Sequence, residues 1–225
     1  IRRDLATVFI PSDATPQEVR DCLHEEISQA LGPVNDLYRL PNTVWNDDNF
    51  HTVLTRFDMT ILRSYYAPEL RSGMSQPEVA ALLPRILART NPAGGPVANL
   101  RADPTPTGFV RAIARAMSAG STGRRKAAAR EAVQIAASHG WNDTRTAFAW
   151  FALGRLSLDS DPEEAMTAFM NAGAIHRRTP GAGIQAAHVD MQLAAYALSA
   201  GRAQDAIQLV NRSLSAAIQG ENAAL

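Results

Sequence analysis

The spacing of hydrophobic positions divides the chain into two regions. Residues 1–90 mix apolar runs with aromatic residues, prolines and Asn-Asp clusters, whereas from Gly108 onward an alanine-rich, nearly continuous helical periodicity takes over. Between them, residues 91–107 (NPAGGPVANLRADPTPT) are rich in proline and contain two adjacent glycines, a composition typical of a linker. We therefore predict a first domain over 1–90, a linker over 91–107 and a helical domain over 108–220.

In the first region the pattern predicts one strand and one well-bounded helix. Residues 5–11 (LATVFIP) are apolar and β-branched, as in a strand, whose pairing partners we expect upstream of residue 1. The following TPQE predicts a helix start, with Thr15 as N-cap, Pro16 in the first turn and Glu18 completing a capping box. Gly32 and Pro33 predict its end.

One side of this helix is predicted to be buried. At 100° per residue, one apolar arc collects Val19, Leu23, Ile27, Ala30 and Leu31. Glu26 falls inside the arc, where a carboxylate is costly unless it is paired, protonated or bound to a metal. Burial would raise its pKa, which suits a general acid or base. The alternative is that Glu26 reaches the surface or pairs with an arginine.

Residues 24–36 (HEEISQALGPVND) resemble the metal-binding helix of zincin peptidases, His-Glu-x-x-His-x-x-Gly-x-x-His. The literal register fails because Ser28 stands at the second ligand position. A register anchored on Gly32 makes Glu26 the catalytic glutamate. The resemblance then implies three metal-ligand positions, occupied by Glu25, Gln29 and Asn35.

The resemblance continues downstream. The zincin pattern Leu-Thr-x-x-Asp-x-x-x-Leu-x-x-Tyr is matched by Leu54, Thr55, Asp58, Leu62 and Tyr65. With EEISQALGPVND and WNDDN, residues 1–90 resemble an uncharacterised bacterial family of zincin-like domains, some described only as proposed lipoproteins. This implies a mainly α fold that begins with the C-terminal part of a truncated zincin-like α(+β) domain. It also implies export, with a periplasmic or lipid-anchored precursor.

The departures from a working zincin indicate a non-catalytic domain. All three histidine positions are replaced, amides are poor zinc ligands, and an all-oxygen set suits harder cations. Val44-Trp45-Asn46 stands where zincins carry a methionine turn. We expect no resident cofactor, with zinc or another divalent cation as the alternative. Loops 35–36 and 46–49 are expected to fold over Glu25 and Gln29 and to hydrogen-bond them in place of a metal.

The second region contains an internal repeat. Residues 145–175 align with 186–216 at an offset of 41, a weaker unit covers 109–138, and Gly154 and Ala195 are small enough to let helices approach closely. Each unit predicts a helical hairpin, and the series resembles a tetratricopeptide-type array despite its longer period. A plain helical bundle is the alternative. The basic cluster Arg124, Arg125, Lys126 and Arg130 is expected to be a solvated face, or else to bind an acidic partner.

The composition of the chain narrows the range of possible functions. The 22 basic and 22 acidic residues cancel, which removes the electrostatic case for nucleic acid or an anionic membrane. No apolar run reaches the ~20 residues of a membrane span, and one cysteine excludes an internal disulfide framework. We therefore expect a non-catalytic, exported or envelope-associated scaffold that binds a protein or peptide through its repeats. The alternative is a metal-dependent hydrolase with Glu26 as general base.

Overall fold

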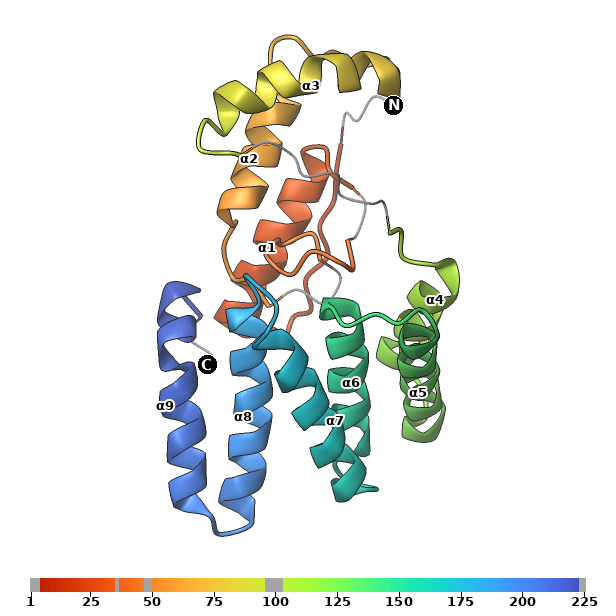
Figure 1. Ribbon diagram of the computed structural model, residues 1–225, viewed down its shortest axis with the longest axis vertical. Coiled ribbons are helices and arrows are strands. Elements are labelled where there is room, and N and C mark those ends of the chain that lie inside the picture. The colour runs from red at the N-terminus through yellow and green to blue at the C-terminus, as the bar shows by residue number, and fades with distance from the viewer. Residues whose placement is uncertain (1–4, 35–36, 47–49, 96–102, 223–225) are drawn as a thin grey trace.

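The structure, a computed structural model, describes residues 5–34, 37–46, 50–95 and 103–222 (Figure 1). These residues are mainly helical, which confirms the predicted mainly α class, and their extended pairing is an isolated bridge between Leu37 and Asn46. The helices are α1 (Pro16–Ala30), α2 (Arg56–Tyr65), α3 (Gln76–Thr90), α4 (Thr107–Met117), α5 (Thr122–Ser138), α6 (Thr144–Ser157), α7 (Pro162–His176), α8 (Gly183–Ser199) and α9 (Ala203–Gln219). Of the predicted linker, residues 96–102 lie outside the described residues.

Local sequence rules determine where the first helices begin. The capping box at Thr15 and Glu18 is confirmed. The Thr15 N–H donates to the Glu18 carboxylate at 2.7 Å, and the Glu18 N–H donates to the Thr15 hydroxyl at 3.3 Å. Thr55 and Asp58 form a second box at the start of α2. The predicted stop is also confirmed, because α1 ends just before Gly32, where a side chain would lie 2.5 Å from the ring of Tyr65.

The strand predicted over residues 5–11 is wrong. This segment runs irregularly beside α1, with Leu5 86% and Phe9 88% exposed. A strand is stabilised by hydrogen bonds to a neighbouring strand, and none of the described residues pairs with this segment. The β-branched pattern therefore has no sheet to join within the described chain.

The second region forms an array of three helical hairpins, α4–α5, α6–α7 and α8–α9, in which each helix packs against the next (Figure 1). They coincide with the three predicted repeat units. The core combines a few large side chains, among them Phe109, Phe151 and Phe169, with many fully buried alanines. Gly154 lets α6 and α7 approach closely, since a Cβ there would lie 2.8 Å from the Phe169 ring. Ala195, by contrast, is exposed.

The loop between α1 and α2 docks on one end of the array (Figure 1). Phe50 stacks on His188 of α8, with ring centroids 4.2 Å apart, and meets Phe151 of α6 edge-on at 5.5 Å. At the end of α9, Thr52 Oγ1 donates to the Gly220 carbonyl at 3.0 Å. The first region therefore shares apolar contacts with the core of the second.

Candidate functional site

The side of helix α1 that packs against the rest of the protein is opposite to the side that was predicted to be buried. Ser28 is its one buried residue, and its hydroxyl accepts a 2.8 Å hydrogen bond from the Trp45 indole. Leu23, Ile27 and Leu31 are 36%, 49% and 46% exposed. The predicted burial of the apolar arc is wrong because the loop that carries Trp45 covers the polar side of α1 instead.

The apolar side of α1 faces a groove of about 400 Å³, which we call the α1 groove. Its walls combine the exposed apolar arc of α1 with Leu54 and with Leu62 of α2. Arg20, His24 and Ser28 add polar atoms to the lining.

The candidate metal residues are only partly brought together. Glu26 is exposed, which agrees with the alternative that its side chain reaches the surface, and its role as general base stays a prediction. Glu25 and Gln29 are half-buried, one helical turn apart, while Asn35 lies outside the described residues, as do the loop residues 36 and 47–49.

Of the three candidate ligands, the structure describes two, the carboxylate of Glu25 and the amide of Gln29. Catalytic zinc takes three protein ligands, so the metal site stays a prediction. In the described ranges, no group of three or more His, Cys, Asp or Glu side chains is placed to hold a metal ion. No catalytic step is derived from this helix.

A second groove, of about 550 Å³, opens in the helical array, and we call it the array groove. It lies between the α4–α5 corner and α6, with Phe50 from the docked loop at its edge. The apolar lining consists of Phe50, Met117, Phe148, Phe151, Ala152 and Leu156. The polar lining consists of Thr122, Arg125, Arg155 and Asp159, so it carries two guanidinium groups and one carboxylate.

The two arginines are held differently. Arg125 is half-buried, and its Nε donates to the Ala116 carbonyl at the end of α4, at 2.9 Å. Arg155 is exposed on α6, close enough to His188 that its charge adds to the effect of burial, and together they lower the pKa of His188 to about 4. A ligand in the array groove would therefore meet both apolar side chains and two guanidinium groups.

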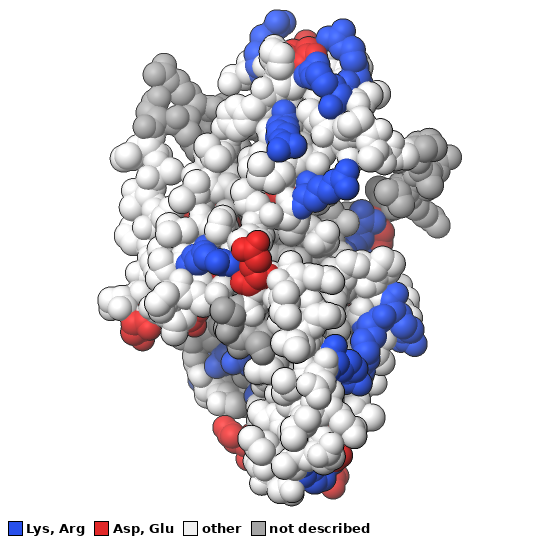
Figure 2. All heavy atoms as spheres, turned by 90° about the vertical axis from the view of Figure 1, so that its left-hand side faces the viewer, with Lys and Arg blue, Asp and Glu red and all other residues white. Residues whose placement is uncertain are grey.

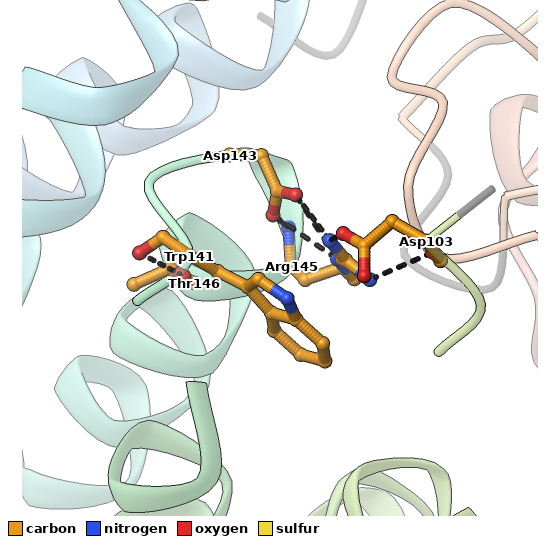
Figure 3. Close-up of polar contacts among 5 residues, drawn as sticks. All are labelled: Asp103, Trp141, Asp143, Arg145 and Thr146. Carbon is orange, nitrogen blue, oxygen red and sulfur yellow. Dashed lines mark hydrogen bonds and ion pairs between the residues drawn. The ribbon is translucent and has the colours of Figure 1, made fainter. Parts of the chain in front are cut away.

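A buried arginine links the segment before α4 to the start of α6 (Figure 3). The Arg145 side chain is fully buried, binds the carboxylates of Asp103 and Asp143, and lies 3.5 Å from the centroid of the Trp141 ring. Because Asp103 precedes α4 and Asp143 caps α6, Arg145 ties the two helices that flank the groove. This cluster was not predicted from the sequence. Its local part could have been found from WNDTR, but the bond to Asp103 spans 42 residues.

The prediction that the basic cluster on α5 is a solvated face is wrong for Lys126. Lys126 is 8% exposed and lies 2.7 Å from Glu164 of α7. Arg130 is exposed and binds the same carboxylate through two 2.8 Å hydrogen bonds. Arg124 remains exposed, and Arg125 lies in the array groove. The acidic partner of this cluster therefore includes a residue of the chain itself.

The fold and grooves define a mainly α-helical protein with a hairpin array and no metal cluster among its described residues. Residues 2–85 match the family described as "Protein of unknown function (DUF2927)". The match covers α1, α2 and most of α3, a little over a third of the chain, and supports the predicted resemblance to an uncharacterised family. No curated protein and no solved structure matches the chain. Among the described residues, no helix has the length and apolarity to cross a membrane.

Proposed function

We propose that the chain is a non-catalytic binding protein whose array groove takes a peptide segment of a partner protein. The observation that carries this proposal is the groove itself: about 550 Å³, open to solvent, and lined by three phenylalanines and two arginines among other residues. Concave, mostly apolar surfaces with a few placed polar groups are the usual binding sites of proteins. The arginines favour a segment that combines apolar side chains with an acidic group.

The geometry of the array supports this use. Three consecutive hairpins stack in chain order, as in tetratricopeptide-type repeats, and stacks of this kind offer extended surfaces to peptides. The groove lies between the first hairpin and α6, and the ion pair of Arg145 with Asp103 links the segment before α4 to the start of α6. A groove with fixed walls loses little conformational entropy when a ligand binds.

For the first region we propose a zincin-like scaffold that has exchanged its metal site for packing. The support is the second capping box: Asp58 caps α2 and also accepts a 3.1 Å hydrogen bond from the Val44 N–H, in the segment that stands where zincins carry a methionine turn. Export, or attachment to the envelope, is proposed from the family resemblance alone. A hydrolase that uses Glu26 gains no support, because this side chain is exposed outside a buried site.

The proposal is tested by selecting peptides from a random phage-displayed library against the full chain and measuring their binding by calorimetry. We expect peptides that combine aromatic or aliphatic residues with Asp or Glu, with micromolar Kd values. Arg155→Glu should weaken binding at least fivefold, since it reverses a charge in the lining.

The matched control is Arg178→Glu, a charge reversal at an exposed residue in the turn after α7. It should leave the Kd within twofold of the wild-type value. The proposal fails if no peptide is enriched, or if Arg155→Glu and Met117→Glu both leave the binding of the enriched peptides unchanged.

A further inference from the structure

The α1 groove is a second concave surface, which the function proposed above leaves unused. Leu23, Ile27 and Leu31 are exposed and follow one another at intervals of four residues, so they line one wall along the length of α1. Leu54 and, on α2, Leu62 line the other wall. The groove therefore offers two apolar walls, one of which has the spacing of helical turns.

Side chains that bridge the two walls hold the groove in shape. Trp45 donates from its indole to Ser28 of α1 at 2.8 Å, and its ring meets Phe57 of α2 edge-on with centroids 6.5 Å apart. At the end of α1, the Tyr66 hydroxyl donates to the Leu31 carbonyl at 2.6 Å. A groove that is formed before binding loses little conformational entropy when a ligand enters.

The rim of the groove on the α2 side is basic. At 100° per residue, Arg63 and Arg56 lie about 100° and 120° round α2 from Leu62, on the exposed side of the helix. Among the described residues, no acidic group forms an ion pair with either arginine. Figure 2 shows Lys and Arg side chains over the upper part of the molecule, where α2 and α3 lie, with few acidic side chains among them.

The acidic residues of the same segment are already engaged. Asp58 is fully buried in the capping box of α2, and Glu78 closes the capping box of α3. Glu69 is shared by Arg85 and Arg89, at 3.3 and 2.7 Å. Residues 50–95 contain no further acidic residue. The positive charge of the α2 rim is therefore left for a partner.

The rim on the α1 side carries the opposite charge. Glu26 is exposed and lies about 20° from Val19 round α1, next to the lining of the groove. Its carboxylate forms no ion pair within the described part of the chain. Arg20, the arginine of the lining, is already bound to Thr52 and Glu221. The two rims thus differ in charge, basic at α2 and acidic at α1.

We propose that the α1 groove binds an amphipathic helix of a partner protein, with acidic residues on the flank that meets α2 and a basic residue on the flank that meets Glu26. The 15 residues of α1 span about 22 Å at 1.5 Å per residue, the length of about four helical turns. A concave groove between two helices fits a convex helix, whereas a flat bilayer would not enter it. The opposite rim charges also fix the direction of the bound helix, since reversing it would exchange its flanks.

The test uses the full chain and two synthetic peptides of about 15 residues, the length of α1. Both peptides carry leucines at intervals of three and four residues. The first has Glu on one flank of this stripe and an equal number of Lys on the other, and the second has Gln on both, so neither peptide has a net charge. Fluorescence anisotropy should give the first peptide a Kd on the order of 10 μM and the second a Kd at least fivefold higher.

Variants of the chain locate the contact. Ile27→Glu should weaken binding of the first peptide at least tenfold and keep a folded circular-dichroism spectrum, because this side chain is 49% exposed. Ile207→Glu, at an isoleucine of α9 that is 52% exposed, is the matched control and should leave the Kd within twofold of the wild-type value. Arg63→Glu should weaken the first peptide at least fivefold and change the Kd of the second less than twofold.

Three results would each overturn the proposal: no binding of either peptide, equal binding of both, or an Ile27→Glu variant that binds the first peptide as the wild type does. Arg155→Glu separates this surface from the array groove and should leave the Kd of the first peptide within twofold. If Arg155→Glu weakens that peptide instead, the peptide occupies the array groove. This result would overturn the present inference and support the function proposed for the array groove.

Discussion

At the scale of single residues, Ser28 joins α1 to the loop that follows it. Its hydroxyl accepts from the Trp45 indole and donates to the Glu25 carbonyl, both at 2.8 Å, so both its donor and its acceptor functions are used. Trp45 is only 2% exposed, so bulk water could not replace Ser28 as the acceptor for its N–H. A buried donor that loses its acceptor costs about 1–3 kcal/mol. The serine is therefore part of the packing of the first region.

We predict that Ser28→Ala lowers the free energy of unfolding by about 2 kcal/mol, because it leaves the Trp45 N–H buried without an acceptor. Ile27→Ser, at the neighbouring position, should change it by less than about 0.5 kcal/mol, since the isoleucine is half exposed. Urea unfolding followed by tryptophan fluorescence measures both. The opposite order of effects would mean that α1 buries its apolar side after all.

At the scale of elements, one carboxylate fastens α5 to the α6–α7 hairpin. Glu164 of α7 binds Arg130 and Lys126 of α5 and accepts from the Ser157 hydroxyl of α6 at 2.9 Å. The Arg130 hydrogen bonds, supported by Lys126 and Ser157 against the effect of burial, lower the pKa of Glu164 from 4.5 to about 2. Three helices thus meet at one side chain that is charged in the folded state.

This pKa sets the pH range in which the contact acts. Because the folded pKa lies below the unfolded one, the stabilisation is complete above pH 4.5 and is lost as the pH falls toward 2. Glu164→Gln should therefore cost about 2 kcal/mol at pH 7 but less than about 1 kcal/mol near pH 3. Chemical denaturation at both pH values measures the two differences. Glu163→Gln, at the exposed neighbour, serves as control and should cost little at either pH.

At the scale of the whole molecule, the first region and the array form a continuous packed structure. Tyr38 meets Phe109 of α4 edge-on at 6.3 Å, and Gln185 of α8 donates to the Pro41 carbonyl at 2.5 Å. Arg20 of α1 donates to the Glu221 carbonyl at 2.9 Å. The family match ends at residue 85, but the packing of the matched segment continues into α4, α8 and the end of α9.

Two histidines, the buried His176 and the partly buried His188, make the folded chain sensitive to mild acid. Burial first, with Arg155 and His51 adding to it, lowers the pKa of His188 from 6.5 to about 4. Burial and the neighbouring Arg177 do the same for His176. In the unfolded chain each would take up a proton near pH 6.5, so stability declines as the pH falls from 6.5 to 4.

We predict that His188→Gln removes about 2 kcal/mol of the stability difference between pH 7 and pH 4.5 that the wild type shows. The variant should also be less stable at pH 7, because it loses the stacking of Phe50 on the imidazole. Urea titrations at several pH values give the slope of the unfolding free energy against pH. If this slope is the same in the variant and the wild type, His188 is protonated in the folded protein at pH 4.5. His139→Gln, at an exposed histidine, is the control.

The candidate sites show which parts of the protein could be anticipated. The position of α1 could be predicted from the sequence, because its cap depends on three residues and its end on Gly32. The side of α1 that is buried could not be predicted, since it is covered by Trp45, which lies 17 residues away from Ser28. The lining of the array groove likewise depends on Phe50, which reaches α6 from the first region.

The sequence by itself determined the helices and their order, because caps, turns and 3.6-residue periodicity act within a few neighbouring residues. Only the tertiary structure decided which helix faces are covered and which charges are paired. The deciding contacts join distant segments, such as Asp103 with Arg145 and Pro41 with Gln185. An amphipathic pattern predicts that a face is apolar, but the surface that packs there determines whether it is buried, as the exposed arc of α1 shows.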